Sequence, residues 1–282
     1  MSKADPRFIW YQLNDEDSWK KSGSAQPFIK PSDIKARHVS LPPLEEQRRI
    51  VGLLDRAAEI RRRADAARAK ARAIIPALFL DTFGDPAINP KGWTTAKLGE
   101  LAKFSGGGTP SKANTEFWNG TIPWVSPKDM KPDMIQQSED KITEAAMEAS
   151  PVKLIPPKSV LVVVRGMILV HTVPIRMNAV SVTLNQDMKA ITPFERLDPL
   201  FLRWALQSLH GFLLSKVRES AHGTKKLETS VLTEYQLMVP PLLLQSAFAE
   251  QAQRIETIIS TLDAAAAKAE AMAAALSAEV FK

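Results

Sequence analysis

The feature that most constrains this chain is an internal repeat, in which a Pro-Pro-Leu motif precedes a long helical segment. The stretch Pro42-Pro-Leu-Glu-Glu-Gln47 recurs as Pro240-Pro-Leu-Leu-Leu-Gln245, 198 positions later. The same offset, without a gap, pairs Phe83 with Phe281. A shared alanine content does not produce both a matching motif at one end and a matching phenylalanine at the other. The chain therefore contains two copies of one structural unit.

Each copy predicts a helix of about 40 residues, which at about 1.5 Å per residue is a rod of about 60 Å. Apolar residues recur seven apart in both copies and in the same phase, which is typical of the a and d positions of a coiled coil. One copy alone is equally consistent with an ordinary amphipathic core helix, but two copies in phase favour helices that pack on each other. The predicted seam residues are Ile50, Leu53, Ala57, Ile60, Ala64, Ala67, Ala71, Phe248, Ile255, Ile258, Leu262, Ala265 and Ala269.

The region between the two helices has a different pattern. It is rich in Pro and Gly and contains short β-favouring runs at 159–165 and 179–184, which predict a mixed, mainly β domain. A helical pattern at 199–219 matches a shorter one at 6–13. We therefore expect an α+β chain divided into a remnant of a first domain, a long helix, one complete domain and a second long helix, with bounds 1–41, 42–86, 87–240 and 241–282.

Composition narrows the class of protein. The chain has no cysteine, which excludes disulfides, a thiol nucleophile and cysteine-ligated metal sites. No stretch is apolar for the 18 or so residues that a membrane span needs, and the first residues lack the apolar run of a signal peptide. We expect a cytoplasmic protein that does not contact membranes. The net charge of +6 suits a polyanionic partner.

Catalytic patterns are weak throughout the sequence. The segment 106–112 is glycine-rich, but it lacks the Gly-Lys pair of a phosphate-binding loop, and Pro110 interrupts it. Pro132-Asp133 and Asp187-Met-Lys189 fit a nuclease pattern only across a long gap. The four histidines are scattered without metal-ligand spacing. We expect no catalytic residues, no metal site and no enzymatic activity.

A recognition surface remains, because lysine and arginine neutralise phosphates while polar side chains read base edges. For any single lysine an ordinary solvated position remains an open alternative. Residues in loops beside glycine are the better candidates, since side chains and backbone there can reach a duplex. The candidate DNA contacts are Thr109, Ser111, Lys112, Lys128, Arg165, Arg176, Lys225 and Lys226.

The order of these features resembles the DNA-specificity subunit of Type I restriction–modification systems. The resemblance runs from about residue 23 to the C-terminus, and the order of its motifs is more specific than any one of them. Those motifs are Pro42–Gln47, Ala77–Pro86, Gly107–Ser111, Ile122–Val125 with Asp129, Arg165-Gly166, Asn185-Gln186, Gly223–Leu227 and Pro240-Pro241.

The resemblance implies a function. In that family two recognition domains bind the halves of a split DNA site, and two helices packed as an antiparallel coiled coil set their separation. The helices also dock methyltransferase subunits, which bring S-adenosylmethionine and modify adenine, and a motor–nuclease subunit completes the endonuclease complex. The specificity subunit itself has no activity and no cofactor.

One departure from the family pattern leaves alternatives open. Only the domain at 87–240 is expected to be complete, while 1–41 matches the end of another. The chain is then either a fragment or a half-subunit, and two copies could pair to rebuild a reader of a symmetric site, although a monomer is equally allowed. A coiled-coil interaction protein that has lost DNA binding, or an enzyme such as a nuclease, are the competing interpretations.

Overall fold

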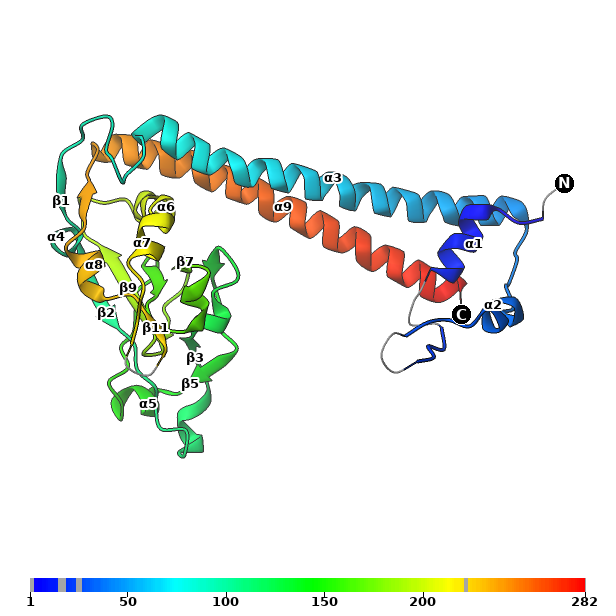
Figure 1. Ribbon diagram of the computed structural model, residues 1–282, viewed down its shortest axis with the longest axis horizontal. Coiled ribbons are helices and arrows are strands. Elements are labelled where there is room, and N and C mark those ends of the chain that lie inside the picture. The colour runs from blue at the N-terminus through cyan, green and yellow to red at the C-terminus, as the bar shows by residue number, and fades with distance from the viewer. Residues whose placement is uncertain (1–2, 15–18, 24–26, 221–222, 282) are drawn as a thin grey trace. The chain divides into compact units, whose positions relative to one another are not determined.

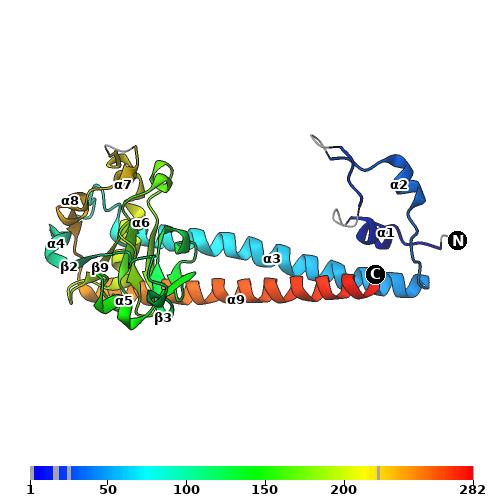
Figure 2. The same cartoon turned by 90° about the horizontal axis from the view of Figure 1, so that it is seen from below.

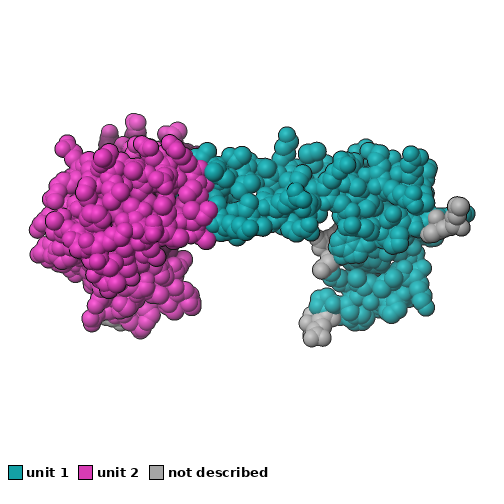
Figure 3. Space-filling model, turned by 90° about the horizontal axis from the view of Figure 1, so that it is seen from above, with its two compact units in different colours: residues 1–72, 256–282 teal, residues 73–255 magenta. Residues whose placement is uncertain are grey.

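The structure is a computed structural model that describes residues 3–14, 19–23, 27–220 and 223–281. The chain divides into two compact units, coloured separately in Figure 3. Unit 1 comprises residues 1–72 and 256–282, and unit 2 comprises residues 73–255.

Unit 1 is an antiparallel pair of helical segments with two short helices at one end. It contains α1 (Pro6–Leu13), α2 (Pro31–Ala36), residues 44–72 of α3 (Leu44–Phe83) and residues 256–280 of α9 (Leu242–Val280). Arg61 pairs with Glu270 at 2.8 Å and Arg68 with Asp263 at 2.7 Å, so residue numbers rise along one helix as they fall along the other (Figures 1 and 2). The sequence-based prediction of two long, antiparallel helices is confirmed.

The seam between these segments differs in register from the predicted one. Ile50 and Leu54, four residues apart, lie together in the core of unit 1, whereas Leu53 is 39% exposed. Ile60 and Ile258 are 47% and 55% exposed, and Ala265 is exposed as well. Of the predicted seam residues, Leu53, Ile60, Ile258 and Ala265 therefore lie outside the observed seam. The buried or half-buried predicted seam residues are Ile50, Ala57, Ala64, Ala67, Ala71, Phe248, Ile255, Leu262 and Ala269.

A physical reason explains the difference. Arginines occupy the true seam edge at positions 61 and 68, where each guanidinium reaches a carboxylate of α9. A seam predicted from apolar residues alone does not include such positions, because arginine counts as a polar residue. Its aliphatic stem nevertheless packs along apolar surface. Alanine at 64 and 71 is buried in the seam and permits close approach of the helices.

Unit 2 is the mixed, mainly β body that the sequence predicts. Its larger sheets are a five-stranded one in the order β2-β9-β6-β7-β4 and a three-stranded one in the order β5-β3-β8. The two-stranded pairs are β1-β12 and β10-β11. The strands are β1 (Thr95–Lys97), β2 (Ala102–Gly106), β3 (Trp118–Val125), β4 (Met134–Ile135), β5 (Asp140–Ile142), β6 (Val160–Val163), β7 (Ile175–Asn178), β8 (Thr183–Leu184), β9 (Met188–Pro193), β10 (Arg218–Glu219), β11 (Lys225–Lys226) and β12 (Gln236–Met238).

Short helices cover this body. They are α4 (Leu98–Leu101), α5 (Glu144–Glu148), α6 (Pro199–Ser208), α7 (His210–Ser215) and α8 (Thr229–Thr233). The helix predicted at 199–219 is broken at Leu209, which ends α6, and the chain then continues as α7 and β10. Of the run predicted as a strand at 179–184, residues 183–184 form β8, which pairs with β3, and Val182 forms an isolated antiparallel bridge with Ile155.

The core of unit 2 lies between the five-stranded sheet, α6 and the ends of the long helices. Central strand β6 is buried at all four positions, as expected for a strand covered on both faces. Phe83 packs edge-on against Phe201 of α6, with ring centroids 4.9 Å apart, and Phe248 packs on Phe83 at 5.4 Å. These buried rings tie the end of α3 and the start of α9 to the body.

The repeated motif forms the same local structure in each unit. Gln245 accepts a hydrogen bond from the backbone N–H of Asp198 at 2.9 Å and donates to the carbonyls of Arg196 and Pro240. Asp198 in turn caps α6. In unit 1, Gln47 bonds to Asp5, Lys3 and Pro42 in the same way, and Asp5 caps α1. The copy of the helix predicted at 6–13 is therefore confirmed.

Within the ranges given above, no helix combines the length and apolar character that crossing a bilayer requires. The same ranges contain no cluster of three or more His, Asp or Glu side chains placed to hold a metal ion.

Candidate nucleic-acid interface

The glycine-rich segment 106–111 is held in place by two tryptophans. The indole N–H of buried Trp124 donates to the carbonyl of Gly108 at 2.9 Å, and that of Trp118 donates to Ser111 at 3.2 Å. The two rings pack edge-to-face with centroids 5.2 Å apart. The loop therefore has a fixed path, although its sequence suggests flexibility.

A glycine is required where this loop meets the segment after β8. The N–H of Gly108 donates to the carbonyl of Leu184 at 2.8 Å. A Cβ at Gly107 would lie 1.9 Å from the carbonyl oxygen of Asn185, a distance that no side chain tolerates. Thr109 Oγ1 donates to Gln186 Oε1 across the same junction. The two loops form one rigid ridge.

A second junction joins this ridge to residues 164–166. The carbonyl of Asp187 accepts from the N–H groups of Val164 and Arg165, at 2.8 and 3.2 Å. Gly166 has φ of +128°, which only glycine adopts readily, and its N–H donates to Lys225 at 3.0 Å. Arg165 and Lys226 form an antiparallel bridge. Four segments distant in sequence are thus linked by backbone hydrogen bonds.

We call these four linked segments the loop surface, comprising residues 106–112, 164–166, 185–189 and the hairpin 218–228 without 221–222. Its cations are Lys112, Arg165, Lys189, Arg218, Lys225 and Lys226. Lys225 pairs with Glu219 at 2.7 Å, which lowers the pKa of that carboxyl, and Lys226 pairs with Glu228 at 2.8 Å. Among described residues the other four cations have no carboxylate partner, so the surface carries excess positive charge.

Six of the eight candidate DNA contacts lie on the loop surface, namely Thr109, Ser111, Lys112, Arg165, Lys225 and Lys226. The other two lie elsewhere in unit 2. Lys128 forms ion pairs with Asp140 at 2.9 Å and Glu139 at 3.1 Å, and the hydrogen bonds that it donates to these carboxylates raise its pKa. Arg176 lies on β7, 3.9 Å from Asp133.

Three polar residues of the loop surface, Arg218, Gln186 and Lys189, lie outside the set of eight candidate DNA contacts. Gln186 is exposed beside Thr109, and Lys189 follows it on β9 with its Nζ against Gly106. A polar signal was visible at both, because Asn185-Gln186 and Asp187-Met-Lys189 stood out as motifs. Their spatial position could not be read from sequence, since it depends on the register of β2 against β9.

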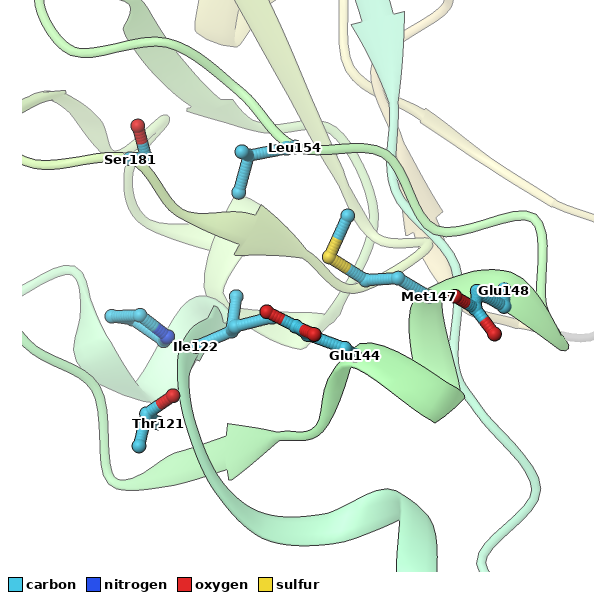
Figure 4. A pocket seen from close by; sticks show the side chains of 8 residues that line it. Thr121, Ile122, Glu144, Met147, Glu148, Leu154 and Ser181 are labelled. Carbon is cyan, nitrogen blue, oxygen red and sulfur yellow. The ribbon is translucent and has the colours of Figure 1, made fainter.

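A separate cavity in unit 2 has a different character. It has a volume of about 520 Å³ and is open to solvent. Figure 4 shows Met147 and Leu154 lining it together with the carboxylates Glu144 and Glu148 of α5. Neither carboxylate forms an ion pair with a described residue, so this face is acidic and disfavours phosphate.

The chain is similar to known proteins both in sequence and in fold. The family model described as "Type I restriction modification DNA specificity domain" matches residues 90–272. The EcoR124I/EcoR124II specificity subunit of Escherichia coli is 37% identical over 171 residues, which are 60% of this chain and 42% of that protein. The MjaIX specificity subunit of Methanocaldococcus jannaschii is 28% identical over 177 residues, 62% of this chain and 38% of that protein. The chain thus spans less than half the length of these relatives.

Solved structures share the fold over nearly the whole chain. An HsdS subunit from Thermoanaerobacter tengcongensis aligns with a TM-score of 0.53 and 22% identity, covering 99% of this chain and 70% of that one. The S subunit of a Type I system from M. genitalium aligns with a TM-score of 0.68 and 14% identity, covering 99% and 73%.

Proposed function

This chain belongs to the family of Type I restriction modification DNA specificity domains, and from that premise we propose that it reads double-stranded DNA through the loop surface. The observation that carries this proposal is the backbone network that links four segments around Lys112, Arg165, Lys189 and Arg218, cations that no carboxylate of the described residues engages. Rigid loops suit sequence readout, because a positioned side chain loses little entropy on meeting a base. Phosphate neutralisation by Lys112, Arg165, Lys189 and Arg218 supplies affinity.

We assign the reading of one half of a bipartite site to residues 87–240, as a single recognition domain. Residues 1–41 correspond to the last part of another such domain, because α1 and its Asp5 cap repeat α6 and its Asp198 cap. The chain performs no covalent step in this proposal, and modification and cleavage belong to partner subunits.

The long helices are proposed to dock methyltransferase subunits. Leu53 and Ile60 are exposed seven residues apart on α3, so they share one face of that helix. Ile258 and Met272 are exposed fourteen residues apart on α9 and likewise share a face. Apolar side chains repeated at heptad spacing outside the seam are suited to partner helices. Membership of the same family supports a further partner, a motor–nuclease subunit that would complete the restriction complex.

Salt-dependent binding to DNA tests the reading proposal. A duplex pool selected on the purified chain is titrated at several salt concentrations. Lys112→Ala and Arg165→Ala are each expected to weaken binding and to reduce the salt slope by about 1. Lys141→Ala, which removes an exposed cation of β5 outside the loop surface, is the matched control. Equal salt slopes for all three variants would remove the loop surface from the interface.

Co-purification tests the docking proposal. Ile60→Asp and Ile258→Asp are expected to abolish capture of the cognate methyltransferase subunit, while Ala66→Asp at another exposed position of α3 retains it. Capture with unchanged yield by all three variants contradicts docking on these faces. Sedimentation of the chain with and without DNA decides whether two copies pair, and a strict monomer in both removes that arrangement.

A DNA-binding-deficient interaction protein is the alternative function. Retained capture of the methyltransferase subunit together with no measurable affinity for any duplex would favour it.

A further inference from the structure

We propose that Gln186 is a specificity-determining residue that reads an adenine of the target through the major groove. This inference rests on the proposed function of the loop surface and deepens it, because it assigns one kind of base to one side chain.

The backbone on both sides of Gln186 is held by hydrogen bonds. Asn185, only 8% exposed, donates its N–H to Val125 at 2.9 Å, and its side-chain Oδ1 accepts from the N–H of Asp187 at 2.7 Å. The carbonyl of Asp187 accepts from Val164 and Arg165 as described above. Gln186 therefore projects from a turn whose two flanking residues cannot shift without breaking several bonds.

The side-chain amide of Gln186 is oriented by its neighbour. Thr109 Oγ1 donates to Gln186 Oε1, which uses one lone pair of that oxygen. Within the described part of the chain, the second lone pair on Oε1 and both hydrogens on Nε2 have no partner, and Gln186 is exposed. This set is one acceptor beside one donor in a plane. It matches the N6 donor and N7 acceptor that adenine presents in the major groove, the pairing that Asn and Gln side chains favour.

The surrounding charges leave this role to Gln186. Lys225 and Lys226 are engaged by Glu219 and Glu228. Lys189 lies on β9, and its Nζ is close to Gly106 of the paired strand β2. These cations suit phosphates, which position a protein on the duplex without reading its sequence. The side-chain amide of Gln186 is neutral and does not attract phosphates electrostatically, so it contributes to the selection of a base.

Selection of bound duplexes from a random pool, followed by sequencing, tests the inference. The wild-type chain is expected to enrich a short element that contains an adenine whose replacement lowers affinity about tenfold or more. Gln186→Ala should lose the preference at that one position, with an unchanged salt slope. Gln186→Glu keeps only acceptors and should move the preference at that position towards cytosine, whose N4 is a donor. Thr109→Val should weaken the same preference.

The matched control is Gln136→Ala, which removes an exposed glutamine that follows β4, outside the loop surface. It should leave every position of the element unchanged. Thermal unfolding of Gln186→Ala should match the wild type, because the side chain is exposed. If Gln186→Ala keeps the full wild-type element, this inference is overturned while the proposed function stands. If the wild type enriches no element, the proposed function fails, and the inference fails with it.

Discussion

The side-chain amide of Gln47 makes in unit 1 the same three hydrogen bonds that the amide of Gln245 makes in unit 2. Each accepts from the aspartate that caps a following helix, and each donates to the carbonyl two residues before that aspartate and to the first proline of its own motif. Both side chains are fully buried. This shared clamp explains why glutamine ends the repeated motif, since it fixes the entry of a long helix against a preceding short one.

Removing the clamp in unit 2 should destabilise the protein. Gln245→Ala leaves the Asp198 N–H and the carbonyls of Arg196 and Pro240 without their partner, and the bond to Pro240 is buried. We expect a loss of about 2–3 kcal/mol in the free energy of unfolding. Urea unfolding measures this. Gln251→Ala, at an exposed position of the same helix, should change stability by less than about 0.5 kcal/mol. Equal stabilities for the two variants would show that the clamp contributes nothing.

A methyl group at Gly107 should disturb the loop surface. Gly107→Ala places a Cβ 1.9 Å from the Asn185 carbonyl oxygen, so one of the two loops must move. We expect a loss of about 1–3 kcal/mol in stability together with weaker DNA binding. The control is Gly211→Ala in α7, where a Cβ meets nothing within 4 Å. That change should be neutral or slightly stabilising, because alanine favours a helix.

The small residues of the helix seam should not tolerate enlargement. Ala64 is 6% exposed, and Ala64→Leu forces α3 and α9 apart in unit 1, at a cost of about 1–3 kcal/mol. Ala66→Leu adds the same volume at an exposed position of α3 and should be nearly neutral. Thermal unfolding followed by circular dichroism distinguishes them. A larger loss for Ala66→Leu would contradict the observed seam.

Tyr235 should make stability depend on high pH. Burial, followed by the nearby charge of Asp85, raises its pKa to about 12 from the ordinary 10, and its hydroxyl donates to the carbonyl of Pro86 at 2.7 Å. The folded state then holds this proton more tightly than the unfolded state, so the stabilisation is complete below pH 10 and is lost as pH rises towards 12.

Ultraviolet titration of tyrosinate measures this shift directly, because the chain contains only two tyrosines. Tyr235→Phe should remove the transition near pH 12 and flatten the stability profile between pH 10 and 12. The remaining transition then belongs to Tyr11, and burial raises the pKa of that residue as well. A transition at the ordinary pKa of tyrosine in the wild type would show that Tyr235 is not buried as described.

Much of the fold could be predicted from the repeat, because Pro-Pro-Leu and the heptad pattern are local signals. The exact seam could not, since Arg61 and Arg68 occupy it through ion pairs that a count of apolar residues misses. The basic loop residues were visible, but their assembly depends on the pairing of β2 with β9 and on carbonyls such as that of Asp187. Lys128 shows the opposite case, a loop cation engaged by Glu139 and Asp140.

Hydrogen–deuterium exchange of the chain with and without a selected duplex tests the central claim most directly. The loop-surface account predicts slower exchange on DNA binding at residues 106–112, 164–166, 185–189 and 223–228, and no change along α5 beside Glu144 and Glu148. Protection confined to α5, or to the long helices, would contradict it.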